Sequence, residues 1–251
     1  MKSKPFIKVL GIPDLQVPYH DHRSLMAVEK VMEVDEWDWI IQYGDFMDHD
    51  CISHHNVGQL RKIEGKTLFA DYAVGNSILD RWQKIQPHAT IVILEGNHDF
   101  RPEKLVDAQP QLRGLVETPH GLNLKKRGIK WVPFWSKGTV FKLGKTTHIH
   151  GLYTNDHHAK KHVMRYGDNV FYGHTHDVQQ YSHVLHGDNK TITGQSLGCL
   201  CRYAQEWMQG KPQNWQQAFV TFTIRPNGFF NHNVVRIFNH QFVFEGKEYK
   251  G

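Results

Sequence analysis

The stretch ATIVILEGNHDF, residues 89–100, joins an apolar run to a polar turn. An uninterrupted apolar run of this length is typical of a strand that is buried on both faces of a sheet. The run ends where Asn97 and His98 stand side by side, and neither residue can extend an apolar strand. This stretch therefore predicts a buried strand whose end delivers polar side chains to one place.

Strand and helix patterns alternate on the N-terminal side of this stretch. Residues 6–12 and 37–45 each contain an apolar run typical of a strand, and residues 21–34 and 67–85 carry apolar residues at helical spacing. Asp21 is the expected N-cap of the first helix. Such alternation predicts a largely parallel sheet with helices on its faces, and ligands bind at the carboxyl edge of such sheets.

The second half of the chain is richer in strands. Residues 139–151 predict a hairpin, residues 156–166 a short helix and residues 169–176 a further strand. From residue 190 onward strand patterns dominate. We expect a single domain spanning residues 1–251, with a core at about 6–185 and C-terminal strands at about 190–250 that complete a second sheet packed on the first.

The composition limits the classes of function. The formal net charge is +5 and the isoelectric point is about 9.0, which favours a polyanionic partner. The three cysteines include the close pair Cys199 and Cys201, a pattern that gives neither a disulfide framework nor a CxxC metal motif and that fits a reducing cytoplasm. No apolar stretch approaches the roughly 20 residues of a membrane span, so we expect no membrane partner.

Five of the predicted strands end on oxygen or imidazole donors. The donor residues are Asp14, Gln16, Asp45, Asp48, Asn97, His98, Asp99, His150, His174 and His176. Carboxylate, amide and imidazole donors suit Mn²⁺, Mg²⁺, Fe or Zn²⁺ better than a metal bound by thiolates. There are more donors than one ion needs, which favours two ions that share a bridging carboxylate and hold a nucleophilic hydroxide between them.

Five motifs along the chain carry a resemblance to a known family. PDLQ (13–16), GDFMD (44–48), GNHD (96–99), HG (150–151) and GHTH (173–176) follow one another in the order typical of the calcineurin-like metallophosphoesterases. The chain resembles the small members of this family from bacteriophages, over residues 6 to 185. The resemblance implies an α/β fold, a four-layer αββα sandwich with two packed mixed β-sheets.

The resemblance also implies a role for each donor. It assigns the first metal to Asp14, Gln16 and His176, the bridge between the metals to Asp45, and the second metal to Asn97, His150 and His174. His98 would stand outside the metal ligands as the catalytic group that assists departure of the leaving group. The expected cofactors are two divalent ions, Mn²⁺ first, with Mg²⁺, Fe, Zn²⁺ or Ni²⁺ as alternatives.

Several assignments remain open at the level of sequence. Gln16 stands where the family usually has histidine; its neutral amide is a poorer donor, which favours hard ions and weakens the first site. His148 alternates with His150 on one strand face, and we favour His150 because Gly151 follows it. We expect Asp48 and Asp99 to orient ligands through hydrogen bonds. Arg101 is a candidate phosphate contact.

The sequence thus predicts a dinuclear metal-dependent phosphoester hydrolase. The expected substrate is a nucleotide or nucleic-acid phosphodiester, because the protein is basic. The alternatives are a phosphomonoesterase and, in another class of function, a non-catalytic module that binds phosphate or metal. We expect it to act in the cytoplasm, that of the host if a phage encodes it. The sequence does not determine the oligomeric state.

Overall fold

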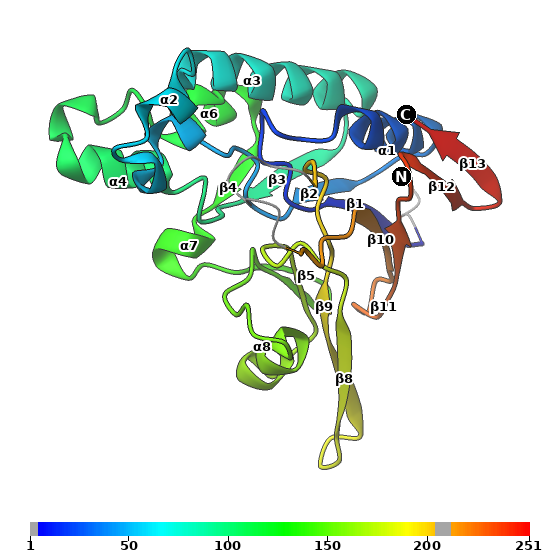
Figure 1. Cartoon of the computed structure of the whole chain (residues 1–251). Coiled ribbons are helices and arrows are strands. Elements are labelled where there is room, and N and C mark those ends of the chain that lie inside the picture. The colour runs from blue at the N-terminus through cyan, green and yellow to red at the C-terminus, as the bar shows by residue number, and fades with distance from the viewer. Residues whose placement is uncertain (1–4, 204–211) are drawn as a thin grey trace.

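The protein has two large mixed sheets that pack face to face between layers of helices (Figure 1). The computed structural model describes residues 5–203 and 212–251. In the view of Figure 1, α1 and α3 lie above the first sheet and α8 lies below the second. This arrangement confirms the predicted α/β sandwich.

The first sheet contains six strands in the order β11-β10-β1-β2-β3-β4. Four neighbouring strands of this sheet run parallel to one another. They are β1 (Ile7–Ile12), β2 (Trp39–Gln42), β3 (Thr90–Leu94) and β4 (Lys130–Val132). Two antiparallel strands extend the sheet beyond β1, namely β10 (Ala218–Ile224) and β11 (Phe230–Arg236). The strand prediction for residues 89–94 is thereby confirmed.

The second sheet contains five strands in the order β5-β6-β7-β9-β8. Their bounds are β5 (Phe141–Leu143), β6 (Thr146–His148), β7 (Val170–Tyr172), β8 (Gln180–Leu185) and β9 (Lys190–Ser196). β5 and β6 form the predicted hairpin around Gly144, while β6, β7 and β9 run parallel. A small separate hairpin of β12 (Gln241–Phe244) and β13 (Lys247–Lys250) packs on α1.

Two long helices cover the outer face of the first sheet, as predicted. α1 (His22–Val34) begins at Asp21, whose carboxylate accepts a hydrogen bond from Ser24 N at 2.9 Å. α3 (Leu68–Ile85) is capped in the same way by Thr67. α8 (His158–Tyr166) packs on β8 and β9 of the second sheet. Among the helices within residues 5–203 and 212–251, none combines the length and apolar character needed to cross a membrane.

Short helices fill the connections around the sheet edges. They are η1 (Asp50–Ile52), η2 (His54–Asn56), α2 (Leu60–Ile63), α4 (Arg101–Ala108), η3 (Pro110–Leu112), α5 (Thr118–Gly121), α6 (Leu124–Arg127) and α7 (Phe134–Lys137). Most of them follow β2 and β3, at the carboxyl edge of the first sheet. This edge therefore carries much of the irregular structure of the chain.

The prediction that the C-terminal strands complete the second sheet is wrong for β10 to β13. β9 joins the second sheet, but β10 pairs with β1 of the first sheet, and β12 and β13 join neither. β10 is apolar on both faces, and the position beside β1 covers both of them. Phe219 packs against Phe242 and Phe244 on the helix side, while Val220 and Phe222 lie in the core between the sheets. Only a position inside the sandwich buries both faces.

Candidate metal centre and active site

Hydrogen bonds that involve the backbone join the loops that carry the first three motifs. Gln16 N donates to Asp45 O at 2.8 Å, which ties the loop after β1 to the loop after β2. The buried carboxylate of Asp99 accepts hydrogen bonds from Met47 N at 2.9 Å and from Gly96 N at 3.0 Å, and so joins the loop after β2 to the turn after β3. Asp99 thus connects two neighbouring loops of the cluster, and its expected role in orienting ligands stays a prediction.

Asp45 lies at the centre of the cluster. Its Oδ2 is 3.5 Å from His150 Nε2, and its Oδ1 accepts a hydrogen bond from His98 N at 2.8 Å. His150 Nε2 is also 3.0 Å from Asn97 Oδ1, and its Nδ1 faces the carbonyl oxygen of Tyr43 at 2.8 Å. One donor atom each from Asp45, His150 and His174 lie within 4.8 Å of one another.

Asp14 lies on the other side of Asp45. Both of its carboxylate oxygens accept a hydrogen bond from His174 N at 3.0 Å, and its Oδ1 is 3.3 Å from His176 Nε2. Gln16 Nε2 is 3.5 Å from the same His176 nitrogen. Donor atoms of Asp14, Asp45 and His176 also lie within 4.8 Å of one another. The structure therefore brings the predicted ligands together in two groups that share Asp45.

The two groups fit divalent cations. Metal–ligand bonds to nitrogen and oxygen are about 2.0 to 2.2 Å long, so donors at the separations found here can converge on an ion after small side-chain movements. The carboxylates of Asp14 and Asp45 are almost completely buried and supply negative charge. A buried negative charge without a positive partner is unfavourable, and a bound cation would supply that partner.

Without a cation, protons on the neighbouring imidazoles balance the negative charge of Asp14 and Asp45. Burial works against the ionised form of Asp45, but the charges of His150 and His98 outweigh it and hold the pKa of the Asp45 carboxyl well below its usual range. Burial lowers the pKa of His150, yet Asp45 raises it overall to about 9. The pKa of His176 rises to about 9 against its burial because of its contact with Asp14. Metal binding must therefore displace protons from these imidazoles.

Four candidate ligands adopt left-handed backbone conformations. The φ angles are +50° at Gln16, +48° at Asp45, +69° at His174 and +62° at His176. Residues other than glycine rarely adopt this region, and each such residue costs on the order of 1 kcal/mol or more. Four of the ten non-glycine residues with positive φ in the described part of the chain thus belong to the polar cluster, and strained backbone at such residues is a feature of many functional sites.

Gly173 makes room for Asp14. A Cβ atom at position 173 would collide with Asp14 Oδ2, because the backbone just after β7 lies against that carboxylate. We expect Gly173→Ala to displace Asp14 and to lower metal affinity by roughly 10-fold or more. Isothermal titration with Mn²⁺ checks this. Gly187→Ala is the matched control, because a Cβ there meets nothing within 4 Å. Equal affinities of the two variants would contradict this account of Gly173.

His98 is held beside the cluster by an acidic residue. Its Nδ1 lies 3.1 Å from Asp48 Oδ2, and its Nε2 lies 3.8 Å from Asp45 Oδ2. Arg101 donates to the same Asp48, to the carboxylate at 3.0 Å and to the carbonyl oxygen at 2.7 Å. Asp48 thus fixes both His98 and Arg101, which agrees with an orienting role for this carboxylate.

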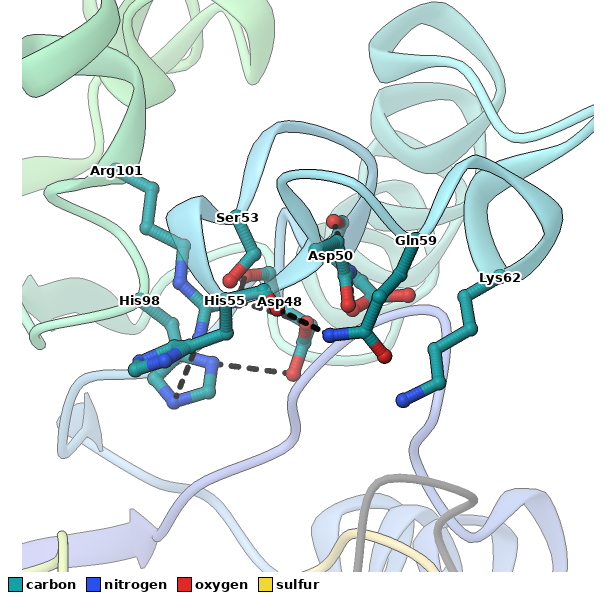
Figure 2. A pocket seen from close by; sticks show the side chains of 9 residues that line it. Asp48, Asp50, Ser53, His55, Gln59, Lys62, His98 and Arg101 are labelled. Carbon is teal, nitrogen blue, oxygen red and sulfur yellow. Dashed lines mark hydrogen bonds and ion pairs between the residues drawn. The ribbon is translucent and has the colours of Figure 1, made fainter.

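A cavity of about 380 Å³ opens next to His98 (Figure 2). In this view His98, His55 and Arg101 lie at one end of it and Lys62 at the other, with Ser53 and Gln59 between them. His55 and Lys62 come from the short helices η2 and α2, and Gln59 from the connection between them. The sequence did not identify these residues, because each is an ordinary polar residue of a connecting segment.

His148 and His150 differ in surroundings. His148 lies within β6, where Tyr43 Oη is 2.7 Å from its Nδ1 and the rings of Phe171 and Phe222 pack against it. Burial lowers the pKa of His148 to about 3. His148 is therefore a core residue, and His150, beyond the end of the strand, is the one that reaches the cluster.

His20 and His22 do not replace the missing histidine at position 16. Both line a separate hollow, together with Arg81 and Arg202. Burial lowers the pKa of His20 to about 4, and its nearest charged neighbours include these arginines. Gln16 is thus the candidate ligand at the position of the first site where the family usually has histidine.

Trp135 is a neighbour of the cluster that the sequence did not reveal. Its ring centroid is 5.5 Å from that of His174 and 6.1 Å from that of His150. Glu95 holds the α7 turn in place by accepting a hydrogen bond from Ser136 N at 2.7 Å. The sequence could have placed Trp135 near the cluster, because this residue follows a strand of the parallel sheet. That strand, β4, is only three residues long, and the sequence pattern did not predict it.

The fold and the donor arrangement define an α/β sandwich protein with candidate metal ligands where the edges of its two sheets meet. No family model matches the sequence. The chain is similar to the Gene 54 protein of Mycobacterium phage L5, with 24% identity over 227 residues, 86% of this chain and 89% of that protein. The Gene 54 protein of Mycobacterium phage D29 is 23% identical over 235 residues, 88% and 90% of the two chains.

Solved structures of Vps29 are similar in fold. Vacuolar Protein Sorting 29 from Cryptosporidium parvum matches with a TM-score of 0.46 and 14% identity, over 99% of this chain and 97% of that one. Vps29 from Entamoeba histolytica, solved with Zn²⁺, matches with a TM-score of 0.42 and 10% identity, over 92% and 99%. Similarity at this level does not identify an activity for this chain.

Proposed function

We propose that this protein is a dinuclear metal-dependent phosphoester hydrolase. The observation that supports this most directly is the pair of donor groups that share Asp45, one with Asp14 and His176 and the other with His150 and His174. A shared carboxylate between two cation sites is the arrangement of two-metal hydrolases. Gln16 completes the first site and Asn97 the second. The mixture of hard oxygens and imidazoles favours Mn²⁺.

Each residue has a distinct role in this proposal. Bound divalent ions would neutralise phosphoryl oxygens and supply a nucleophilic water at neutral pH. Asp14 and Asp45 hold the positive charge at the sheet edge. His98, fixed by Asp48, faces the leaving group and donates a proton to it. Trp135 covers His150 and His174 on one side and limits access of water to their rings.

The cavity beside His98 suits a large alcohol as the leaving group. Monoesters and diesters both release an alcohol, and the space next to His98 can receive it. Arg101 and Lys62, at opposite ends of this cavity, suit an alcohol that bears another phosphate, as a nucleotide does. Together with the basic charge of the chain, this supports a nucleotide or nucleic-acid phosphodiester as the substrate. The phage relatives support action in the cytoplasm of a host cell.

Hydrolysis of nitrophenyl esters with added metals tests the proposed function. The protein freed of metal is titrated with Mn²⁺, its metal content is measured, and turnover of bis-nitrophenyl phosphate is compared with that of nitrophenyl phosphate. We expect two ions per chain and faster hydrolysis of the diester. Faster hydrolysis of the monoester would favour a phosphomonoesterase. Binding of at most one ion without turnover by any divalent metal would favour a non-catalytic binding module.

Gln16→His should strengthen the first metal site. Imidazole is a better donor than a neutral amide, and histidine tolerates the left-handed backbone at this position better than most residues. We expect affinity for the more weakly bound ion to rise by roughly 10-fold or more. Isothermal titration with Mn²⁺ and with Zn²⁺ measures this. Gln59→His, on the cavity wall away from the ligands, is the control, and no difference between the two variants would argue against Gln16 as a ligand.

A further inference from the structure

Two buried thiols lie directly behind His176. Cys201 Sγ is 3.9 Å from His176 Nδ1, and one ring nitrogen of His176 and the sulfurs of Cys199 and Cys201 lie within 4.8 Å of one another. Both cysteines are free and completely buried, and His176 is 5% exposed. The proposed site uses the other ring nitrogen, Nε2, which faces Asp14. The thiols therefore stand on the side of the imidazole that this site leaves unused.

The backbone holds the two cysteines firmly. Leu200 N, between them, donates to Asp14 O at 2.8 Å, and Cys199 N donates to Gln216 O at 3.0 Å. Gln217 Nε2 donates to Cys201 O at 3.1 Å. The segment is thus anchored both to the loop of the first motif and to the start of β10. Such anchoring presents both sulfurs to His176 before any ligand binds, which reduces the entropy that binding would cost.

The spacing fits a tetrahedral ion. Zinc bonds are about 2.3 Å to thiolate sulfur and about 2.0 to 2.1 Å to imidazole nitrogen, which separates the ligand atoms by somewhat less than 4 Å. The sulfur to nitrogen distance found here is already close to that value. Two thiolates would also cancel the charge of a divalent ion, so that a buried site would carry no net charge.

We propose that His176, Cys199 and Cys201 form a third metal site, for a thiophilic ion such as Zn²⁺. This site competes with the manganese site for His176. A neutral imidazole has one nitrogen lone pair available and carries a proton on the other nitrogen. When the ion binds, the two thiol protons are released to solvent, and the imidazole keeps its one proton on Nε2, which donates a hydrogen bond to Asp14 Oδ1, 3.3 Å away. A thiophilic ion therefore withdraws His176 from the first manganese site.

Cadmium titration of the reduced, metal-free protein tests the proposed site. Cd²⁺ bound to thiolates gives a charge-transfer absorption in the ultraviolet that oxygen and nitrogen ligands do not give. We expect this absorption at one equivalent of Cd²⁺ in the wild type and in Cys51→Ser, whose thiol lies elsewhere and is half-buried. We expect its loss in Cys199→Ser and in Cys201→Ser. An absorption that persists in the variant with both Cys199→Ser and Cys201→Ser, or that is absent from the wild type, overturns the proposal.

Two further measurements keep the test independent of variant folding and of catalysis. X-ray absorption spectroscopy of the wild type with one equivalent of Zn²⁺ should show sulfur neighbours at about 2.3 Å, and a shell of only oxygen and nitrogen would contradict the site. Equilibrium dialysis should show that the cadmium-loaded protein binds one Mn²⁺ fewer than the metal-free protein. Unchanged Mn²⁺ binding would contradict the competition. None of these readouts requires hydrolysis, so they stand apart from the test of the proposed function.

Discussion

Asp45→Asn should abolish hydrolysis and empty both metal sites. Asp45 is the residue common to the two donor groups, and the amide of asparagine has the same shape without the negative charge. Loss of the ions removes several kcal/mol of transition-state stabilisation, and about 4 kcal/mol corresponds to a rate on the order of 10³-fold lower. Plasma mass spectrometry measures the metal content, and turnover of bis-nitrophenyl phosphate measures the activity.

The Asp45→Asn substitution does not strain the backbone. Asparagine adopts the left-handed conformation of position 45 as readily as aspartate does, so the substitution introduces no new backbone strain. Asp188→Asn, on the exposed turn between β8 and β9, is the matched control and should leave both quantities unchanged. Two ions and normal turnover in Asp45→Asn would show that Asp45 does not bridge the metals.

His98→Ala should lower turnover by roughly 10²- to 10⁴-fold, the range typical of a lost general acid. Metal content should stay unchanged, because His98 belongs to neither donor group with Asp45. The loss should be larger for a phosphodiester with an alkoxide leaving group than for a nitrophenyl ester, since nitrophenolate departs without a proton. Turnover of both substrates and metal content are measured on the same preparation.

The contrast between the two substrates distinguishes the roles of His98. An equal loss with both leaving groups would mean that His98 positions the substrate rather than donating a proton. A loss of metal would identify His98 as a ligand and would make its assignment to the leaving group wrong. His186→Ala, on the exposed β8–β9 turn, serves as the control and should behave as the wild type.

Local patterns predicted the elements of this fold better than their pairing. β1, β2 and β3 were evident, because strands buried on both faces are apolar at almost every position. The partner of β10 was not evident, because apolar residues on both faces require an interior place but do not specify which strand lies beside it. β4 was missed because three residues are too few to show a period.

The proximity of the candidate ligands could be predicted where each follows a strand. Asp45 and Asn97 stand directly after long apolar runs, so the edge they share followed from the parallel sheet. His148 and His150 could not be separated by alternation, because residues two apart on a strand face the same way. What separates them is position along β6, which ends at His148. The proximity of Cys201 to His176 depends on packing between distant segments, which no local pattern records.

The left-handed backbone conformation of several cluster residues predicts which residues replace them over evolutionary time. Glycine would fit the backbone at Asp45, His174 and His176 with less strain, so drift that favours stability alone would replace them. Homologues that lose the activity should therefore lose these residues early and gain glycine or asparagine there, while their cores stay the same. The residue found at each left-handed position becomes a marker that separates active lineages from those that keep only the fold.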